Sequence, residues 1–206
     1  AERLAARAPA ATHDERRGIA EAIALALNTL GAALARQNRP KDAVTCLERS
    51  VETARAADLL QIECRSLANL GVLYSTVDPA RAIETGQRGL ETAKRIGDFG
   101  LQSRLQTTLA VAYCALTNRC EERGVEAAQA AIELDRRLGQ LDHLTVPLIV
   151  LAQIFQCHGE PGRALGYYQE AVVLAERAGE PQLLFPCYDG LATLYLDMDD
   201  SSQAEH

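Results

Sequence analysis

The sequence predicts an all-α fold built from repeated antiparallel helix pairs, and two observations support that fold class. The motif P-x-x-A occurs three times, at residues 40–43, 79–82 and 161–164. The chain is 48% apolar but only 4% aromatic, and it has no tryptophan. Its commonest apolar residue, alanine, is the best helix former, whereas a β-sandwich needs many β-branched and aromatic residues.

The alanine of P-x-x-A marks a repeat of about forty residues. A glycine fills the same position in the middle of the chain, and alanines without the proline fill it at both ends. The six marker positions are Ala1, Ala43, Ala82, Gly124, Ala164 and Ala204, at intervals of 39 to 42 residues. A period in this range indicates an array of stacked supersecondary units.

A second pattern precedes the markers and predicts the first helix of each pair. It consists of a leucine, a small residue and, three residues after the small one, a large residue. Its five copies are L-G-A-A-L at 30–34, L-G-V-L-Y at 70–74, L-A-V-A-Y at 109–113, L-A-Q-I-F at 151–155 and L-A-T-L-Y at 191–195. Small and large apolar residues at helical spacing are typical of a packed helix face. We therefore expect the large residue of each copy to lie in the core.

The second helix of each pair begins at the proline of P-x-x-A, because proline is tolerated at the first helical position. Asp78, directly before a proline, is a suitable N-cap. Glycines are expected to end these helices in the left-handed conformation, at Gly97, Gly139 and Gly179. Thr12 and Glu15 have the spacing of a capping box before the first complete pair.

These landmarks resemble the tetratricopeptide repeat, whose signature is W-x2-L-G-x2-Y followed by small and large packing residues and a proline. The resemblance covers essentially the whole chain. It implies a right-handed superhelical array of antiparallel helix pairs, an α-solenoid. The tryptophan is absent and the period is about 40 rather than 34, as in the long-repeat type of bacterial signalling and regulatory proteins. Two further departures are two extra residues in the C-E-E-R-G turn at 120–124 and glycines at the packing positions Gly86 and Gly89.

The repeat predicts a single domain over residues 1–206. A partial unit at 1–8 is followed by complete units at about 14–57, 58–97, 98–139 and 140–179, and by a truncated unit at about 180–206. Because the pattern starts and stops within a repeat, we expect the chain to be a segment of a longer array.

Charge and cysteine content exclude several classes of function. A net charge of −7 and a pI of about 5.2 argue against a nucleic-acid partner, which requires a basic surface. The six cysteines form no C-x-x-C unit, which favours reduced cysteines in a cytoplasmic protein. No stretch is expected to approach the ~18 apolar residues of a membrane span, so we expect no membrane partner.

No catalytic, cofactor-binding or metal-binding residues are predicted, and we expect no cofactor. The adjacent Cys157 and His158 would point about 100° apart on a helix, so they are expected to pack and to be solvated respectively rather than to share a ligand. The acidic residues Asp197, Asp199 and Asp200 do not have the spacing of an EF-hand, and a solvated turn is the better interpretation. The protein is therefore not expected to be an enzyme.

The family resemblance implies that the first helices line a partner-binding groove. Carried over position by position, it assigns eight polar candidates: Asn28, Arg36, Arg65, Arg104, Thr107, Gln153, Gln156 and Asp189. Arg65 and Arg104 occupy the same position in successive units, so they could share one anionic group. The alternative is that each pairs with a nearby acid and is merely solvated.

Two functions remain open. The first is a scaffold segment of a larger protein that binds a protein or peptide in its concave groove. The alternative is a regulatory or sensor segment of a multidomain bacterial signalling protein, such as a transcription regulator, ATPase or nucleotide cyclase. Such a segment would contact a small ligand or another domain of its own chain. Fold alone does not distinguish them.

Overall fold

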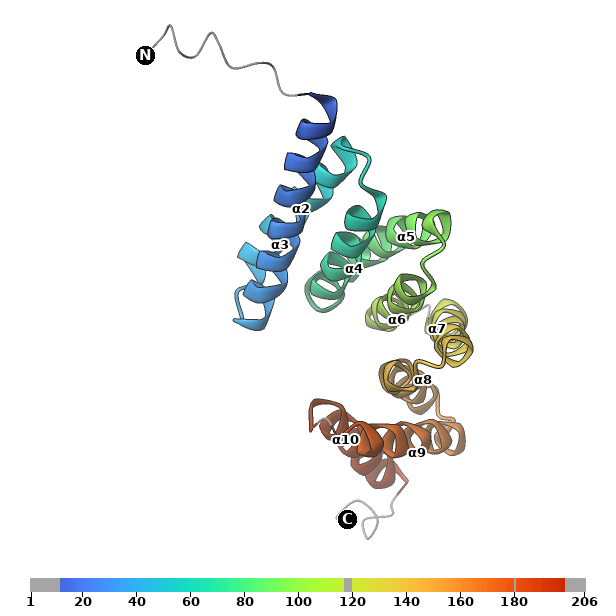
Figure 1. The fold of residues 1–206 in the computed structure, drawn as a ribbon. Coiled ribbons are helices and arrows are strands. Elements are labelled where there is room, and N and C mark those ends of the chain that lie inside the picture. The colour runs from blue at the N-terminus through green and yellow to red at the C-terminus, as the bar shows by residue number, and fades with distance from the viewer. Residues whose placement is uncertain (1–11, 117–119, 180, 199–206) are drawn as a thin grey trace, which may run out of the picture. The chain divides into compact units, whose positions relative to one another are not determined.

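The computed structural model describes residues 12–116, 120–179 and 181–198, and within these ranges it contains helices and turns but no strand (Figure 1). The all-α fold class is therefore confirmed. The chain divides into two compact units, residues 1–66 and 67–206, each of which is described by itself. The predicted partial unit at 1–8 lies outside the described residues, as do Asp199 and Asp200 of the predicted solvated turn. The single-domain organisation stays a prediction.

The first unit contains α2 (His13–Arg36), α3 (Pro40–Ala56) and the beginning of α4 (Leu60–Val77). The predicted capping box is confirmed: Thr12 Oγ1 accepts from the Glu15 N–H at 3.2 Å, and Glu15 Oε2 accepts from the Thr12 N–H at 2.8 Å. α2 and α3 meet at Gly31, where an added Cβ would lie 2.7 Å from Cγ of the buried Leu47. The small residue of the first-helix pattern thus sets the distance between the paired helices.

A buried hydrogen-bond chain joins the three helices of the first unit. Ser50 Oγ on α3 donates to the Ala24 carbonyl on α2 at 2.7 Å. The Ser66 hydroxyl on α4 lies 2.8 Å from Ser50 Oγ and 3.2 Å from Oδ1 of Asn28 on α2. Both serines are completely buried, so these bonds satisfy groups that would otherwise be costly to desolvate.

The second unit continues from Leu67 of α4 through six further α-helices and two short helical turns. In order, they are α5 (Pro79–Ile96), α6 (Phe99–Ala115), the π-helical turn η1 (Cys120–Gly124), α7 (Val125–Leu138), the 3-10 turn η2 (Leu141–His143), α8 (Thr145–Cys157), α9 (Pro161–Ala178) and α10 (Pro181–Asp197). Within this unit the first helices contact one another in sequence, α6 with α8 and α8 with α10, while α7 packs on α6 and α9 packs on α8. The core of the unit includes the predicted Tyr113 and Phe155, both buried, whereas Tyr195 of α10 is half-buried.

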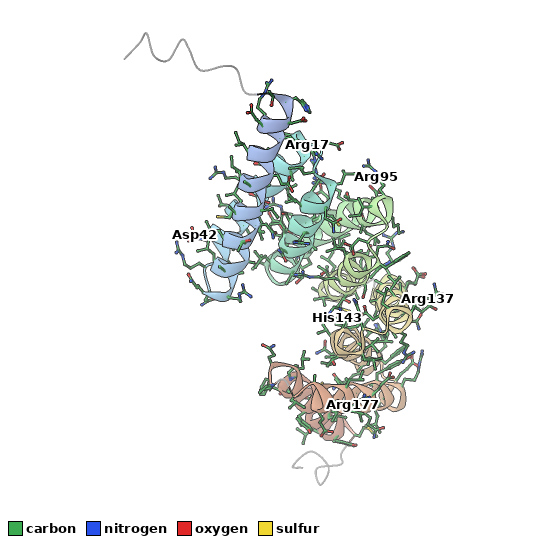
Figure 2. All side chains as sticks on the ribbon, in the orientation of Figure 1. Arg17, Asp42, Arg95, Arg137, His143 and Arg177 are labelled. Carbon is green, nitrogen blue, oxygen red and sulfur yellow. The ribbon has the colours of Figure 1, made fainter. Side chains whose placement is uncertain are left out.

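The helix ends follow the predicted capping residues. α3, α5 and α9 each begin at a proline, and the Asp78 carboxylate accepts from the Arg81 N–H at 3.1 Å. Gly97, Gly139 and Gly179 all have a positive φ, between 67° and 71°. The last turns of α5, α7 and α9 carry Arg95, Arg137 and Arg177, labelled in Figure 2, and cations are favoured at helix C-termini.

The extra residues of the middle repeat take a helical path. C-E-E-R-G at 120–124 forms the π-helical turn η1, which leads directly into α7. Gly124, the marker residue, is buried and has right-handed helical angles, with φ −66° and ψ −46°. A wider helical turn therefore absorbs the extra length while the marker keeps its buried position.

Gly86 and Gly89, which depart from the repeat pattern, make room for α6. A Cβ at Gly86 would lie 2.9 Å from Leu109 Cδ2, and a Cβ at Gly89 would lie 2.8 Å from Leu105 Cδ2 and 3.3 Å from Leu67 Cβ. Leu105 is fully buried and cannot move aside. The side-chain volume missing from α5 is thus supplied by leucines of the next helix.

The expectation that no stretch approaches a membrane span is wrong for α2. Among the described residues, this helix is long and apolar enough to cross a membrane by length and composition, with a mean hydropathy of 1.6 over its most apolar 18-residue window. The cause is its run of alanine, leucine and glycine with few charges. Only 22% of that window is buried, and Ile19, Ile23 and Leu30 are exposed. A single such helix is weak evidence for a membrane, because core helices pass the same test.

Two glycine-to-alanine changes are expected to have opposite effects on stability. Gly89→Ala should lower the free energy of unfolding by about 1–3 kcal/mol, because the new Cβ overlaps buried leucine atoms. Gly166→Ala, in α9, has no atom within 4 Å of the added Cβ and should raise it by about 0.5–1 kcal/mol. Urea unfolding of both variants measures the two values. Stabilisation by Gly89→Ala would contradict the close approach of α5 and α6.

Candidate partner-binding face

The first helices of the second unit form one layer, in which α8 contacts both α6 and α10. α6 and α8 lie side by side in Figure 1, and α10 contacts α8. We call the surface of this layer the first-helix face. It carries Val72 of α4, Arg104 and Thr107 of α6, and Gln153 and Gln156 of α8. Their positions relative to the small residue of each first helix are those that the family resemblance assigns to the groove.

Arg104 is fixed on this face by a neighbouring helix. Its Nη2 donates to Oδ1 of Asn69 on α4 at 2.6 Å, although the two residues are 35 positions apart. Asn69 was not among the predicted site residues. The arginine guanidinium is always protonated in a protein and carries only hydrogen-bond donors. This geometry places a cation on the exposed side of α6.

Gln156 joins three helices at the other end of the face. Its Nε2 donates to Asp197 Oδ2 on α10 at 2.6 Å, and its Oε1 accepts from the Tyr168 hydroxyl on α9 at 3.2 Å. Burial raises the pKa of the Tyr168 phenol to about 12, and nearby Cys157, Asp189 and Cys187 act in the same direction. The phenol therefore keeps its proton near neutral pH and remains a donor. Gln156 and Asp197 thus form one hydrogen-bonded polar group that bridges α8 and α10.

The remaining predicted residues of this unit lie in less constrained positions. Thr107 is half-buried, and its hydroxyl donates to the Ser103 carbonyl of its own helix at 3.1 Å. Gln153 is exposed, and so is Asp189, whose carbonyl accepts from Thr193. The first helices also carry exposed apolar side chains, since Val72 on α4 and Val146 on α8 are 46% and 43% exposed. The face combines a cation, amides and exposed valines.

Three predicted residues belong to the first unit. Arg36 and Arg65 are exposed, on α2 and α4 respectively. Asn28 is buried to 7% exposure and lies in the hydrogen-bond chain with Ser66, so its side chain serves helix packing. Because Arg65 and Arg104 belong to different units, a shared anionic group stays a prediction. Partner contact by any of the eight residues also stays a prediction.

A recurring contact between arginines and aromatic rings was missed at the level of the sequence. The guanidinium carbons lie over the rings of the first-helix pattern: Arg81 over Tyr74 at 4.4 Å, Arg123 over Tyr113 at 6.0 Å and Arg163 over Phe155 at 3.6 Å. Each arginine directly precedes the marker residue of its repeat. The sequence does contain a signal for this contact. The ring and the arginine occur together in these three repeats, and both are replaced in the first repeat, which has Leu34 and Asp42 at the two positions. Cation–π contacts of this kind help to attach each second helix to its first helix.

A small cavity lies beside the last of these contacts. It has a volume of about 260 Å³ and is lined by Val125, Ile154, Phe155, His158, Glu160 and Arg163. Arg163 stacks on Phe155 and forms an ion pair with Glu160 at 2.9 Å. Both charged groups are thus engaged with each other. The cavity is smaller than the ~300–1,000 Å³ of ordinary ligand pockets.

Metal-ligating side chains and thiols are dispersed over the part of the chain that the structure describes. It holds no group of three or more His, Cys, Asp or Glu side chains arranged to bind a metal ion. Five cysteines are free thiols: Cys46, Cys64, Cys114, Cys157 and Cys187. The expectation that Cys157 packs is wrong, because it lies exposed at the last residue of α8.

Comparison with known proteins connects this geometry to a family. Residues 22–95 match the family model of the tetratricopeptide repeat. Tetratricopeptide repeat protein 29 of Trypanosoma brucei brucei is 25% identical over 135 residues, which are 65% of this chain. The chain spans only 28% of the length of that relative.

Solved structures share the fold at low sequence identity. A signal transduction ATPase with numerous domains and a tetratricopeptide repeat sensor, from Pyrococcus horikoshii, has a TM-score of 0.72 and 17% identity, covering 93% of this chain and 30% of that one. The apo form of RapI has a TM-score of 0.69 and 13% identity, covering 88% and 79%. Kinesin light chain repeats from Podosopora anserina have a TM-score of 0.66 and 16% identity, covering 87% of this chain and 89% of that one. The predicted α-solenoid of helix pairs is confirmed by these likenesses.

The hydrogen bond between Tyr168 and Gln156 leads to a stability prediction. Tyr168→Phe should lower the free energy of unfolding by about 0.5–1.5 kcal/mol, because a half-buried amide oxygen loses its donor. Since the Tyr168 phenol keeps its proton near neutral pH, the loss should be the same from pH 6 to pH 9. Thermal and urea unfolding give the value.

Tyr188→Phe is the matched control for this variant. Its hydroxyl donates to Glu176 at 2.8 Å on the exposed surface, so its removal should change stability less. An equal loss of stability for the two variants would show that the hydrogen bond from Tyr168 to Gln156 contributes no more than the exposed one from Tyr188 to Glu176.

Proposed function

We propose that this chain, whose residues 22–95 match the tetratricopeptide repeat model, is an interaction segment that binds a protein or peptide on the first-helix face. The observation that carries the proposal is the pair of inter-helix bridges, Arg104 with Asn69 and Gln156 with Asp197. They fix polar groups at separate points of an exposed surface before any partner arrives. Preorganised groups lose less conformational entropy on binding.

The chemistry of this face favours a partner segment with an acidic group and apolar side chains. Arg104 presents a planar cation that matches a carboxylate. The exposed Val72 and Val146 offer apolar contact on α4 and α8, and Gln153 offers an amide that can both donate and accept. An extended peptide or an amphipathic helix can meet such a surface. Neither partner class requires a cofactor.

A regulatory segment is the second candidate. The Pyrococcus horikoshii structure is described as carrying a tetratricopeptide repeat sensor, and another structure similar to this chain is a Rap protein complexed with Competence and Sporulation Factor, with a TM-score of 0.69 and 10% identity. These likenesses support the fold that a sensor would use. In that role the first-helix face would contact a small ligand or another part of the same polypeptide.

Arginine 104 provides the direct test of the proposed face. Selection from a random peptide library should yield acidic, partly apolar sequences, and Arg104→Ala should weaken their binding by about 10–100-fold, the value of a charge-assisted hydrogen bond. Arg104→Lys should recover only part of the loss, because an ammonium lacks the planar fork. Isothermal titration measures each affinity.

Arg95→Ala is the control, since Arg95 is an exposed arginine at the end of α5, a second helix. It should leave the affinity unchanged. Adding Arg65→Ala to Arg104→Ala tests whether the two arginines bind one anionic group, in which case the second change costs less than it does alone. Equal losses for Arg95→Ala and Arg104→Ala would refute binding on the first-helix face.

A further inference from the structure

One buried acid in the second unit has no counterpart in the other repeats. Asp135, near the end of α7, is only 1% exposed. It stands eleven residues after the marker of its repeat, and at that position the other complete repeats have an alanine. Those alanines are Ala54, Ala93 and Ala175, all fully buried. A carboxyl group thus occupies the position where the other complete repeats have the methyl group of an alanine.

The surroundings of Asp135 only partly satisfy it. Ser103 of α6 lies within hydrogen-bonding reach of its carboxyl group, but the Ser103 hydroxyl also donates to the Ala131 carbonyl of α7 at 3.4 Å, and Asp135 Oδ1 has no hydrogen-bond partner among the described residues. Oγ1 of Thr145, the first residue of α8, is also buried and without a partner. Ser103 and Thr145 occupy the same position in successive first helices, where the earlier repeats have Ala24 and Cys64. Polar residues therefore replace apolar ones on three consecutive helices.

Few charges act on this carboxyl group from the elements packed against α7, which are α6, η1, η2 and α8. His143 of η2, labelled in Figure 2, is the group whose charge acts on Asp135. α8 has no Asp, Glu, Lys or Arg, and Arg104 of α6 is bonded to Asn69. The charged residues of η1 lie at the opposite end of α7. On α7 itself, Arg136 pairs with Glu170 at 2.7 Å, and Arg137 lies 3.9 Å from Glu133.

Burial without a cation disfavours the ionised form of a carboxyl group. Desolvation accordingly raises the pKa of Asp135, while the Ser103 hydrogen bond and the His143 charge act in the opposite direction. Because the raised pKa belongs to the folded state, the folded protein binds more protons than the unfolded one between the two pKa values. The contribution of Asp135 to the free energy of unfolding is then highest below the unfolded pKa of about 3.9, and it falls as pH rises through the folded pKa.

The junction next to Asp135 is also irregular. α6 begins two residues after Gly97, whereas α8 begins only at Thr145, six residues after Gly139, behind the 3-10 turn η2. The first helix of the fourth pair has therefore lost its first turn where the acid is buried. A segment with fewer regular helical bonds is more easily opened.

We propose that Asp135 is a proton-operated device between the third and fourth helix pairs, whose packing tightens when its carboxyl group is protonated and loosens when it ionises. This effect of Asp135 on packing needs no partner, so the inference does not depend on the proposed binding on the first-helix face. It would make the second unit less stable at neutral pH than at mildly acidic pH.

The test compares Asp135→Asn and Asp135→Ala with the unaltered chain by thermal unfolding from pH 4 to pH 9. Asp135→Ala restores the residue of the other repeats, and Asp135→Asn keeps the shape while removing the charge. At neutral pH both should raise the melting temperature by about 2–4 °C or more, the shift that ~1 kcal/mol causes in a chain of this size. The difference should shrink toward pH 4. Glu126→Gln, an exposed change on the same helix, should show no such pH-dependent difference.

Hydrogen exchange locates the effect. In Asp135→Asn at neutral pH, amides of α7, η2 and the start of α8 should exchange more slowly than in the unaltered chain, while amides of α3 in the first unit should be unchanged. A difference in melting temperature that is constant from pH 4 to pH 9 would overturn the proposal. So would destabilisation by both variants at neutral pH, which would make Asp135 a net stabilising group.

Discussion

The helices of this chain meet where one of them carries a residue small enough for two backbones to approach closely. Ala43, Ala82 and Ala164 are completely buried, and an added Cβ at Gly31 would overlap Leu47. Once this closest approach is fixed, the larger side chains around it have little choice of position, because helix packing leaves few voids. The helix pairs therefore recur with the same period as the small residue.

Departures from this small-residue rule show how the packing responds. Where α5 has Gly86 and Gly89, leucines of α6 move into the space, and where the middle repeat is longer, a π-helical turn absorbs the excess. Both departures leave apolar contacts complete. Asp135 differs in kind, because it puts a carboxyl oxygen into a site of methyl size without supplying a partner for it. Violations of this sort are where function is expected to lie.

Local rules made most of the fold predictable from the sequence. Capping residues act within one turn, so Thr12, Asp78 and the three left-handed glycines could be assigned without tertiary information. The partners of the candidate site could not be assigned in this way. Asn69 and Asp197 reach Arg104 and Gln156 across 35 and 41 residues, through side-chain angles that no spacing specifies. Asn28 was placed in the groove by position alone, yet it is buried and its Oδ1 accepts a hydrogen bond from the buried Ser66 hydroxyl of α4.

The candidate face and the buried acid are connected through α6. Ser103 and Arg104 are adjacent on that helix and point about 100° apart, so one contacts Asp135 while the other lies on the exposed face. A partner that draws α6 and α8 together must also change the packing around the carboxyl group between α6, α7 and α8. Linkage is reciprocal: if binding alters the proton affinity of Asp135, protonation alters the affinity for the partner by the same factor. A partner that leaves the helix spacing unchanged binds without any such pH dependence, so the pH dependence of affinity reports whether the array adjusts as it binds.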